Sequence, residues 1–379
     1  MRLFSDVASW VTNPFLRRAF QLAEGGRGTT SPNPVVGCVI ARGDEIVGEG
    51  FHARAGLPHA ETLALAEAGP RAAGATAYVT LEPCNHVGRT PPCSEELIAA
   101  GLAAVVVGMA DPNPIAAGGA LRLRQAGMRV EFAPDPTPFQ IQNEGWLHLI
   151  RTGRPFTRVK VALSLDGHAS VRPGARCAIT GQGGAEITHR LRSAADAVLV
   201  GAATARIDAP ALTARTADGG VMGRQPLRVV LGRSGVPEAE LFHDGHGQSV
   251  ALVPVGVEVP EGVAALRYPA REGIGAALRA LGRAGVADLL VEAGPRLFTA
   301  LWSARLIDEL VVTHGGGLAG PEAPPLWRDA LQAPPGALGG EMTALEAGVA
   351  SEDAVTVWRP RRAADHQAAR PERGRERGR

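Results

Sequence analysis

The chain has 379 residues, of which 45% are hydrophobic and 20% charged, and its formal net charge is +1. This composition is typical of a globular protein of two domains, and it excludes a low-complexity or strongly basic nucleic-acid-binding chain. No apolar run approaches the roughly 20 residues that cross a bilayer, and no signal-peptide pattern opens the sequence. Four cysteines are too few for a disulfide framework, so we expect a cytoplasmic protein with no nucleic-acid or membrane partner.

The first 152 residues alternate helix and strand patterns. Helical spacing of apolar residues predicts a helix over 14–24, which glycines at 25, 26 and 28 end. Two β-rich runs at 35–41 and 45–51 predict a hairpin. We then expect helices over 59–69, 94–101 and 121–127, which alternate with strands over 75–81, 103–109 and 129–132. This alternation predicts an α/β layer with a mostly parallel sheet.

A domain boundary is expected near residue 153, because prolines interrupt the pattern between 133 and 140 and only a short helix over 142–151 follows. The second domain, 153–360, is also predicted to be α/β. Its expected strands lie at 157–164, 195–201, 226–232, 249–255, 287–294, 308–315 and 354–360. Residues 361–379 carry seven arginines against three acids and no apolar face, which predicts a disordered tail.

The triplet His-Ala-Glu at 59–61 and the segment "PCNHVGRTPPC" together predict a metal site. Zinc in hydrolytic sites commonly has three protein ligands, and His59, Cys84 and Cys93 supply that set. The metal lowers the pKa of water, and Glu61, a carboxylate outside the ligand set, can then move protons. Zinc deaminases carry His-x-Glu and Pro-Cys-x-x-Cys. Here eight residues separate the cysteines, which favours a specialised relative over a generic nucleoside deaminase.

Other features are less specific. The segment "GGGLAG" at 315–320 fits a dinucleotide-binding pattern, but prolines follow where a helix must begin, so we do not expect a Rossmann site there. A strand, Gly294 and a helix near Pro295 suit either an anion site or a plain turn. Cys38 and Cys177 are expected to be core thiols.

Longer segments resemble the bifunctional pyrimidine deaminase/reductase family of riboflavin biosynthesis. "TTSPNPVVGCVIARGDEIVGEGFHARAGLPHAE", "LEPCNHVGRTPPC" and "MADPNP" are similar to its deaminase half, and "VKVALSLDGHAS", "AITG", "LRSAADAVLVGAATARIDAPALTAR" and "LIDEL" to its reductase half. The resemblance covers nearly everything from Pro14 to Pro360. It implies an N-terminal cytidine-deaminase-like α/β/α domain and a C-terminal dihydrofolate-reductase-like α/β domain.

For the first half, the resemblance implies hydrolytic deamination of 2,5-diamino-6-(5-phosphoribosylamino)pyrimidin-4(3H)-one with one Zn²⁺ per chain. Glu61 would take a proton from the attacking water and deliver it to the ring nitrogen and then to the departing amine. Asn33 and His52 match positions that contact the pyrimidine, and His86 and Arg89 match the loop that holds the substrate phosphate.

For the second half, the resemblance implies NADPH-dependent reduction of the ribosyl group of 5-amino-6-(5-phosphoribosylamino)uracil to ribityl, in a homo-oligomer (dimer or tetramer). The expected substrate residues are Lys160, Arg176, Arg192, Leu212, Arg215 and Glu292, and the cofactor residues are Ala162, Ala178, Thr204, Asp208 and Gly294. The family usually has Ser-x-Trp-Ile-Thr where this chain has residues 176–180, so a serine and a tryptophan are replaced. Gly232 stands where an aspartate is common.

Three alternatives follow from these residues. The chain could be a deaminase alone, with a degenerate reductase domain. A tRNA adenosine deaminase is a second alternative, although the near-neutral charge and the phosphate-suited loop argue against it. A non-catalytic zinc-binding module is the third, and it would have little need for Glu61 beside the metal.

Overall fold

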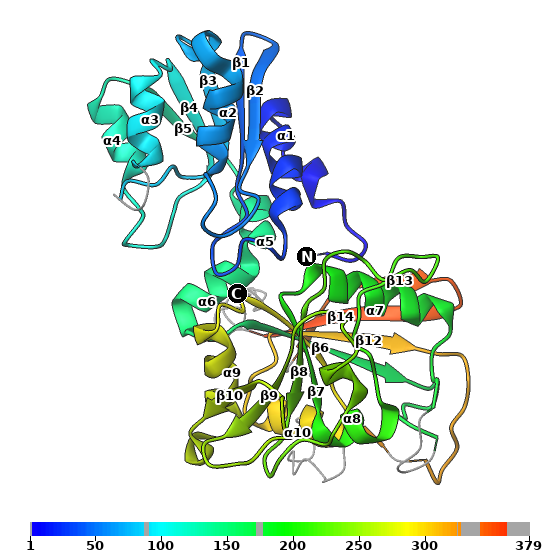
Figure 1. Ribbon diagram of the computed structural model, residues 1–379. Helices are drawn as coiled ribbons and strands as arrows, with labels where there is room; N and C mark the ends of the chain where they lie inside the picture. Colours follow the sequence, from blue (N-terminus) through cyan, green and yellow to red (C-terminus); the bar gives the residue numbers. More distant parts are fainter. Residues whose placement is uncertain (1, 87–90, 172–176, 324, 327–341, 362–379) are drawn as a thin grey trace, which may run out of the picture. The chain divides into compact units, whose positions relative to one another are not determined.

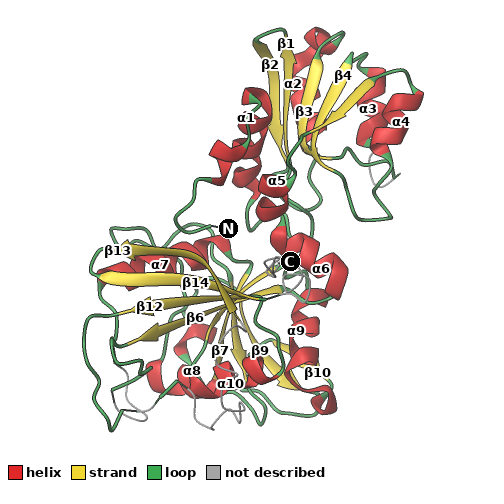
Figure 2. Cartoon of the chain, turned by 180° about the vertical axis from the view of Figure 1, so that it is seen from behind, coloured by secondary structure: helices red, strands yellow, loops and turns green. Residues whose placement is uncertain are grey.

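The computed structural model describes residues 2–86, 91–171, 177–323, 325–326 and 342–361 (Figures 1 and 2). The chain divides into two compact units: Met1–Phe156 with Thr188–Val291, and Thr157–Ile187 with Glu292–Arg379. The predicted disordered tail, apart from its first residue, lies outside the described residues. Among the described residues, no helix combines the length and the apolar character needed to cross a membrane.

A five-stranded sheet in the order β2-β1-β3-β4-β5 forms the first layer of unit 1. The predicted hairpin is confirmed, because β1 pairs antiparallel with β2. Strand β1 is antiparallel to β3 as well, and only the pairs β3-β4 and β4-β5 are parallel. The expectation of a mostly parallel sheet was therefore wrong for this layer. The strands are β1 (Gly37–Arg42), β2 (Glu45–Phe51), β3 (Thr76–Leu81), β4 (Ala104–Met109) and β5 (Arg129–Phe132).

Helices cover both faces of this sheet, and alternate residues of its strands point to the two sides. In β4, Val105 and Val107 pack with the cluster that contains α2, α3 and α4, whereas Val106 packs with the cluster of α1, α5 and α6. Figure 1 shows α2, α3 and α4 together on one face, and Figure 2 shows α1 and α5 in front of the other. The helices are α1 (Pro14–Ala23), α2 (Ala60–Ala68), α3 (Cys93–Ala99), α4 (Gly119–Gln125), α5 (Thr137–Gln142) and α6 (Glu144–Thr152).

Helix α2 rests directly on two glycines of β2. A Cβ atom at Gly50 would lie 2.4 Å from the carbonyl oxygen of Ala60, and one at Gly48 would lie 2.2 Å from that of Ala64. A side chain at either position would therefore push the helix away from the sheet. Because Ala60 lies between His59 and Glu61, this close approach sets the position of the first turn of α2.

The rest of unit 1 is a parallel layer in the strand order β10-β9-β8-β7-β11. Apart from the edge strand β10, which is only partly buried, its strands have buried, mainly apolar centres, as expected when helices cover both faces. Helix α7 spans the division between the units. The elements are α7 (Gln182–Ala194), β7 (Ala197–Gly201), α8 (Ala202–Asp208), β8 (Leu227–Leu231), β9 (Ser249–Pro254), β10 (Ala265–Tyr268), α9 (Gly273–Arg283) and β11 (Asp288–Glu292).

Unit 2 contains the strand order β6-β12-β14-β13, in which β6 and β12 are parallel and the other pairs antiparallel. The buried carboxylate of Glu309 lies between two guanidinium groups. Arg158 Nε donates to its Oε1, and Arg359 Nη2 donates to its Oε2 at 2.7 Å. The elements are β6 (Phe156–Leu163), α10 (Pro295–Ser303), β12 (Glu309–His314), β13 (Met342–Ala350) and β14 (Asp353–Pro360).

Two strands, β10 and β13, were not predicted from the sequence. The short helix expected over 142–151 is present as α6, and a second helix that was not predicted, α5, ends just before Asn143. The amide of Asn143 accepts from the backbone nitrogen of Val35 at 2.9 Å and donates to its carbonyl at 3.0 Å. The side chain of Asn143 thus pairs both backbone polar groups of Val35, as a neighbouring strand would.

Candidate active site

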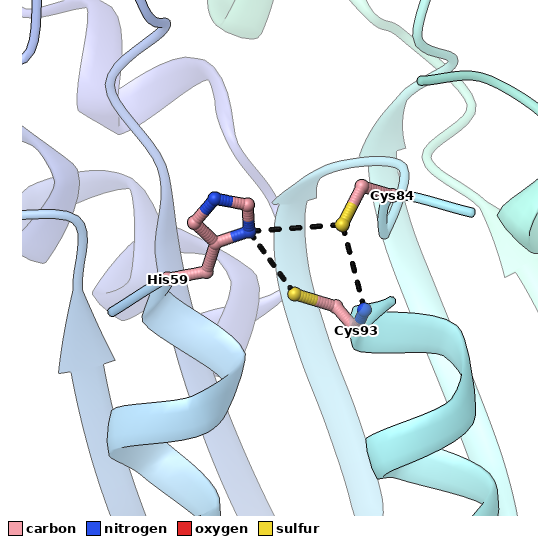
Figure 3. Close-up of side chains that lie close together, drawn as sticks. All are labelled: His59, Cys84 and Cys93. Carbon is pink, nitrogen blue, oxygen red and sulfur yellow. Dashed lines mark hydrogen bonds between the residues drawn. The ribbon is translucent and has the colours of Figure 1, made fainter. Parts of the chain in front are cut away.

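Helix starts and a strand end bring the predicted metal ligands together. His59 is the residue before α2, and Cys93 is the first residue of α3. Cys84 follows β3 by three residues. One ligand atom of each residue lies within 4.8 Å of the other two (Figure 3). His59 Nδ1 lies 3.2 Å from Cys93 Sγ and 3.7 Å from Cys84 Sγ.

The donor set fits zinc. Two sulfurs and one imidazole nitrogen are the ligand types that zinc prefers, and three protein ligands leave a fourth position for water or substrate. Cys84 Sγ also accepts from the backbone nitrogen of Cys93 at 3.4 Å. The hydrogen bond with the Cys93 thiol, together with His59, lowers the pKa of Cys84 to about 4, whereas the pKa of Cys93 is raised by the same pairing and by burial. Of the two cysteines, Cys84 is therefore the one that ionises more readily.

Glu61 lies in the first turn of α2 and is only 3% exposed. Burial, with a further contribution from the charge of Cys84, raises the pKa of Glu61 to about 7 in the metal-free chain. A carboxyl group with this pKa can both accept and release a proton near neutral pH. Its place beside the three ligands suits acid and base chemistry on a molecule bound there.

His52 and Asn33 lie next to this cluster. The rings of His52 and His59 meet edge to face with centroids 5.4 Å apart. His52 Nδ1 lies 3.2 Å from the carbonyl oxygen of Pro58, which makes it the donor nitrogen and leaves Nε2 as an acceptor facing Asn33 Nδ2 at 3.4 Å. Burial lowers the pKa of His52, which favours the neutral ring. An amide and a neutral imidazole can together present hydrogen bonds to a polar heterocycle.

The loop between the two cysteines is described in part. His86 is exposed, and Arg89 lies outside the described residues. Asn85, beside His86, makes two hydrogen bonds. Its backbone nitrogen donates to the carbonyl oxygen of Ala116 at 2.9 Å, and its side-chain oxygen accepts from Ser94 Oγ at 2.9 Å. The start of this loop is therefore fixed next to Cys84.

Two side chains that support the cluster were missed in the sequence. Thr62 Oγ1 donates to Glu96 Oε2 at 2.6 Å and so ties α2 to α3. Each of these residues follows a predicted ligand, His59 or Cys93, by three positions. Residues three positions apart lie on the same side of a helix, one turn from each other. That spacing could therefore have indicated that Thr62 and Glu96 lie near the ligands.

Glu82 is a third side chain that was missed in the sequence. Its Oε1 accepts from the backbone nitrogens of Gly118 and Ala120 at 3.2 and 2.9 Å, and its Oε2 accepts from that of Asp111 at 3.1 Å. Glu82, which lies two residues before Cys84, thereby holds the loop after β4 and the start of α4 close to that ligand. Its position directly before Pro-Cys is the only signal in the sequence.

In unit 1, several predicted reductase residues gather around Thr213. Arg192, on α7, donates to its carbonyl oxygen at 3.0 Å, and Arg215 donates to its hydroxyl at 3.2 Å. Leu212 is fully buried and has a positive φ of 53°, which is unusual for a branched residue. Thr204 and Asp208 lie on α8.

In unit 2, Lys160 and Ala162 lie on the same face of β6, two residues apart. The Lys160 carbonyl accepts from the backbone nitrogen of Ala293 at 3.4 Å, so the segment with Glu292 and Gly294 runs beside it. The strand, turn and helix predicted around Gly294 are present, because β11 ends at Glu292 and α10 begins at Pro295. Ala178 is exposed, and Arg176 lies outside the described residues.

Three further expectations have clear outcomes. Cys38 is fully buried, which confirms a core thiol, but Cys177 is exposed, so that prediction was wrong: its apolar neighbours lie in a loop. After the glycine-rich segment 315–320, the described residues 321–323 and 325–326 form no helix, in agreement with the rejection of a Rossmann site. A Cβ atom at Gly232 would lie 1.9 Å from the carbonyl oxygen of Gly235, so an aspartate there would require the backbone to move.

Comparison with known families matches both halves of the chain. Residues 11–109 match the cytidine and deoxycytidylate deaminase zinc-binding region, and residues 155–335 match the RibD C-terminal domain. The riboflavin biosynthesis protein RibD of Escherichia coli (strain K12) is 42% identical over 325 residues, which cover 82% of this chain and 89% of that protein.

Solved structures agree over nearly the whole length. Acinetobacter baumannii RibD, form 1, is 34% identical with a TM-score of 0.81, and the match covers 94% of this chain and 99% of that one. A diaminohydroxyphosphoribosylaminopyrimidine deaminase/5-amino-6-(5-phosphoribosylamino)uracil reductase from Thermotoga maritima is 30% identical with a TM-score of 0.79, covering 91% and 97%. These matches confirm a deaminase-like domain followed by a reductase domain. The chain therefore belongs to the RibD family and is a bifunctional deaminase and reductase of riboflavin biosynthesis.

Proposed function

We propose that the chain hydrolyses the 2-amino group of 2,5-diamino-6-(5-phosphoribosylamino)pyrimidin-4(3H)-one and then reduces the ribosyl group of the product to ribityl with NADPH. The observation that carries the first step is the cluster of His59, Cys84 and Cys93 with the buried Glu61 beside it. Family membership and the match to the RibD C-terminal domain support the second step.

His59, Cys84 and Cys93 would hold one Zn²⁺ per chain. When bound, zinc makes water acidic enough to act as a nucleophile near neutral pH. The ligands come from the start of α2, the end of β3 and the start of α3, and the hydrogen bond between Thr62 and Glu96 joins the two helices. The closeness of these three side chains supports their assignment as the zinc ligands.

Glu61 would move the protons of the deamination. It accepts one from the attacking water as the oxygen bonds to the pyrimidine carbon that bears the amino group. It then delivers that proton to the adjacent ring nitrogen. A second proton from the oxygen passes to the amino group, the carbon–nitrogen bond breaks and ammonia leaves. Burial suits Glu61 to both directions of transfer, because it disfavours a permanent charge on the carboxyl group.

Asn33 and His52 would orient the pyrimidine. Their facing polar atoms, 3.4 Å apart, lie beside the ring of His59. His86, and Arg89 beyond the described residues, would bind the substrate phosphate with their side-chain nitrogens. This assignment makes the insertion between Cys84 and Cys93 part of substrate recognition.

For the reduction, NADPH would supply the hydride. Arg192 and Arg215 suit a phosphate because guanidinium groups can bind its oxygens in pairs, and both already converge on Thr213. Lys160, Arg176, Leu212 and Glu292 complete the proposed substrate set. The proposed cofactor positions are Ala162, Ala178, Thr204, Asp208 and Gly294. We assign the deaminase to 1–152 and the reductase to 153–360.

A coupled assay tests both steps together. The zinc-loaded chain receives the diaminopyrimidine substrate and NADPH, and ammonia release and NADPH oxidation are followed in one reaction. We expect ammonia first and NADPH oxidation only after it. Oxidation without prior ammonia would contradict the order of the steps. Ammonia without oxidation, also when the deaminated product is supplied, would contradict the reductase assignment.

Partners and location follow from composition and family. The near-neutral charge supports small-molecule substrates rather than nucleic acid. A homo-oligomer, dimer or tetramer, stays a prediction that light scattering of the purified chain would test. The low cysteine content supports a cytoplasmic location, which also stays a prediction.

A further inference from the structure

The loop that carries Asn33 is attached to residues far along the chain. Ser31 Oγ donates to Asp196 Oδ2 at 2.7 Å. The same oxygen accepts from the backbone nitrogens of Ala287 and Asp288 at 2.9 and 2.8 Å. Ser31 lies in the region that matches the deaminase family, whereas its partners lie in the region that matches the RibD C-terminal domain. All of them belong to the same compact unit.

A second attachment holds the start of this loop. Arg224 Nε donates to the carbonyl oxygen of Gly28 at 3.0 Å, while its two other nitrogens donate to the carbonyl oxygens of Ser193 and Ala195. A Cβ atom at Gly28 would lie 1.9 Å from the guanidinium carbon of Arg224, and φ at Gly28 is +75°. The positive φ therefore favours glycine at position 28, and a side chain there would displace the guanidinium group of Arg224.

The other end of the loop reaches the deaminase site. The backbone nitrogen of Asn33 donates to the carbonyl of the buried Thr30 at 2.8 Å, which closes a tight turn around Ser31. The Asn33 side chain then meets His52, the neighbour of His59. Because the turn is short, a shift of Ser31 displaces Asn33 as well.

We propose that Asp196 and Arg224 are positioning residues for deamination: the reductase region holds the loop that presents Asn33 to the pyrimidine. The inference rests on the proposed role of Asn33. Hydrogen bonds to charged groups are stronger than those between neutral groups, and one carboxylate oxygen here gathers three donors. Without this anchor, Asn33 must be ordered when substrate binds, which weakens binding more than it slows the chemical step.

The test uses the full-length, zinc-loaded chain and the Ser31→Ala variant, which removes one hydroxyl and leaves the backbone intact. We expect KM for deamination to rise about tenfold, since a hydrogen bond to a charged group is worth roughly that factor or more, with kcat changed less than about threefold. Ser31→Thr, which keeps the hydroxyl, should restore most of the loss. Ser193→Ala is the matched control, because its hydroxyl donates to the nearby carbonyl of Arg190 and not to the loop.

Asp196→Asn and Asp244→Asn extend the test to the other side of the contact. Asp244 is also a carboxylate paired with an arginine, but its hydrogen bonds join it to Arg228 and to the backbone nitrogen of His246 instead of the loop. Hydrogen exchange of the segment 28–35 should speed up in Asp196→Asn and stay unchanged in Asp244→Asn. An unchanged KM in Ser31→Ala with unchanged exchange in Asp196→Asn would overturn the proposal. Absence of ammonia release from the unmutated chain would instead overturn the proposed function.

Discussion

Glu61 in the candidate deaminase site and Glu309 in unit 2 are both almost completely buried, yet their environments have opposite effects. Burial and the charge of Cys84 raise the pKa of Glu61 to about 7. Burial also acts to raise the pKa of Glu309, but Arg158 and Arg359 outweigh it and hold the value at about 2. The partners of a buried carboxyl group, more than its depth, therefore decide whether it can exchange protons or serves only to hold charged neighbours.

The largest expected effect is on Glu61. Glu61→Gln should lower the rate of ammonia release by ~10²-fold to 10⁴-fold, because this carboxyl group would perform several proton transfers. Zinc content, NADPH-dependent reduction of the deaminated product and thermal stability should change little. Ammonia release and bound zinc are measured on the same preparation. Retention of more than about a tenth of the activity would remove Glu61 from the proton-transfer role.

Cys84→Ser is the companion variant for that measurement. It should lose zinc as well as activity, because a hydroxyl group is a poor replacement for a thiolate ligand. Equal zinc content in Cys84→Ser and the unmutated chain would contradict the ligand assignment.

Glu309→Gln should affect stability instead of chemistry. Removing one partner of a buried ionic group leaves uncompensated charge on Arg158 and Arg359, which typically costs about 3–5 kcal/mol in the free energy of unfolding. Denaturant unfolding measures this loss. Glu322→Gln, at an exposed glutamate, is the control and should change the free energy by less than about 0.5 kcal/mol. A Glu309→Gln chain as stable as the control would show that the two glutamates do not differ as described.

The contribution of Glu309 to stability should also depend on pH. The pKa of Glu309 is about 2 when folded against an ordinary value of 4.5, so its ionised form stabilises the fold at pH values above about 4.5. That contribution is lost as the pH falls from 4.5 towards 2, where the folded chain also takes up the proton. We expect the stability difference between the unmutated chain and Glu309→Gln to shrink over this range. A difference that is constant with pH would contradict the assigned pKa.

The smallest expected effect concerns a site without a buried charge. If Ala178 contacts the cofactor as proposed, Ala178→Trp adds an indole that bound NADPH would cover, and burial of such a ring is worth about 1–3 kcal/mol. NADPH should bind roughly tenfold more tightly for each 1.4 kcal/mol regained, while deamination stays unchanged. A fluorescence titration measures this, with Cys177→Trp, at the neighbouring exposed residue, as control. Weaker NADPH binding by Ala178→Trp would mean that other groups already fill the space.

The sequence predicts the features whose causes are local. Asn13 caps α1 through its side chain and Pro14 opens the helix, so that boundary could be predicted from neighbouring residues. The ligand set was predictable because His59, Cys84 and Cys93 lie within 35 residues and at element ends. By contrast, "MTALEAGVA" at 342–350 has a composition that favours helix, yet it pairs with β14 as a strand. The contact between Ser31 and Asp196 joins residues 165 positions apart, and no local pattern indicates it.

The packing of α2 on Gly48 and Gly50 has a consequence for which mutations this enzyme can tolerate. Adding a single methyl group to β2 at either position would bring it into the backbone of the helix that holds Glu61. Ala66, on the exposed side of the same helix, has room for larger residues. We therefore expect a larger residue to be tolerated at Ala66, whereas a larger residue at Gly48 or Gly50 should abolish deamination. Neither glycine needs to touch the substrate for this effect.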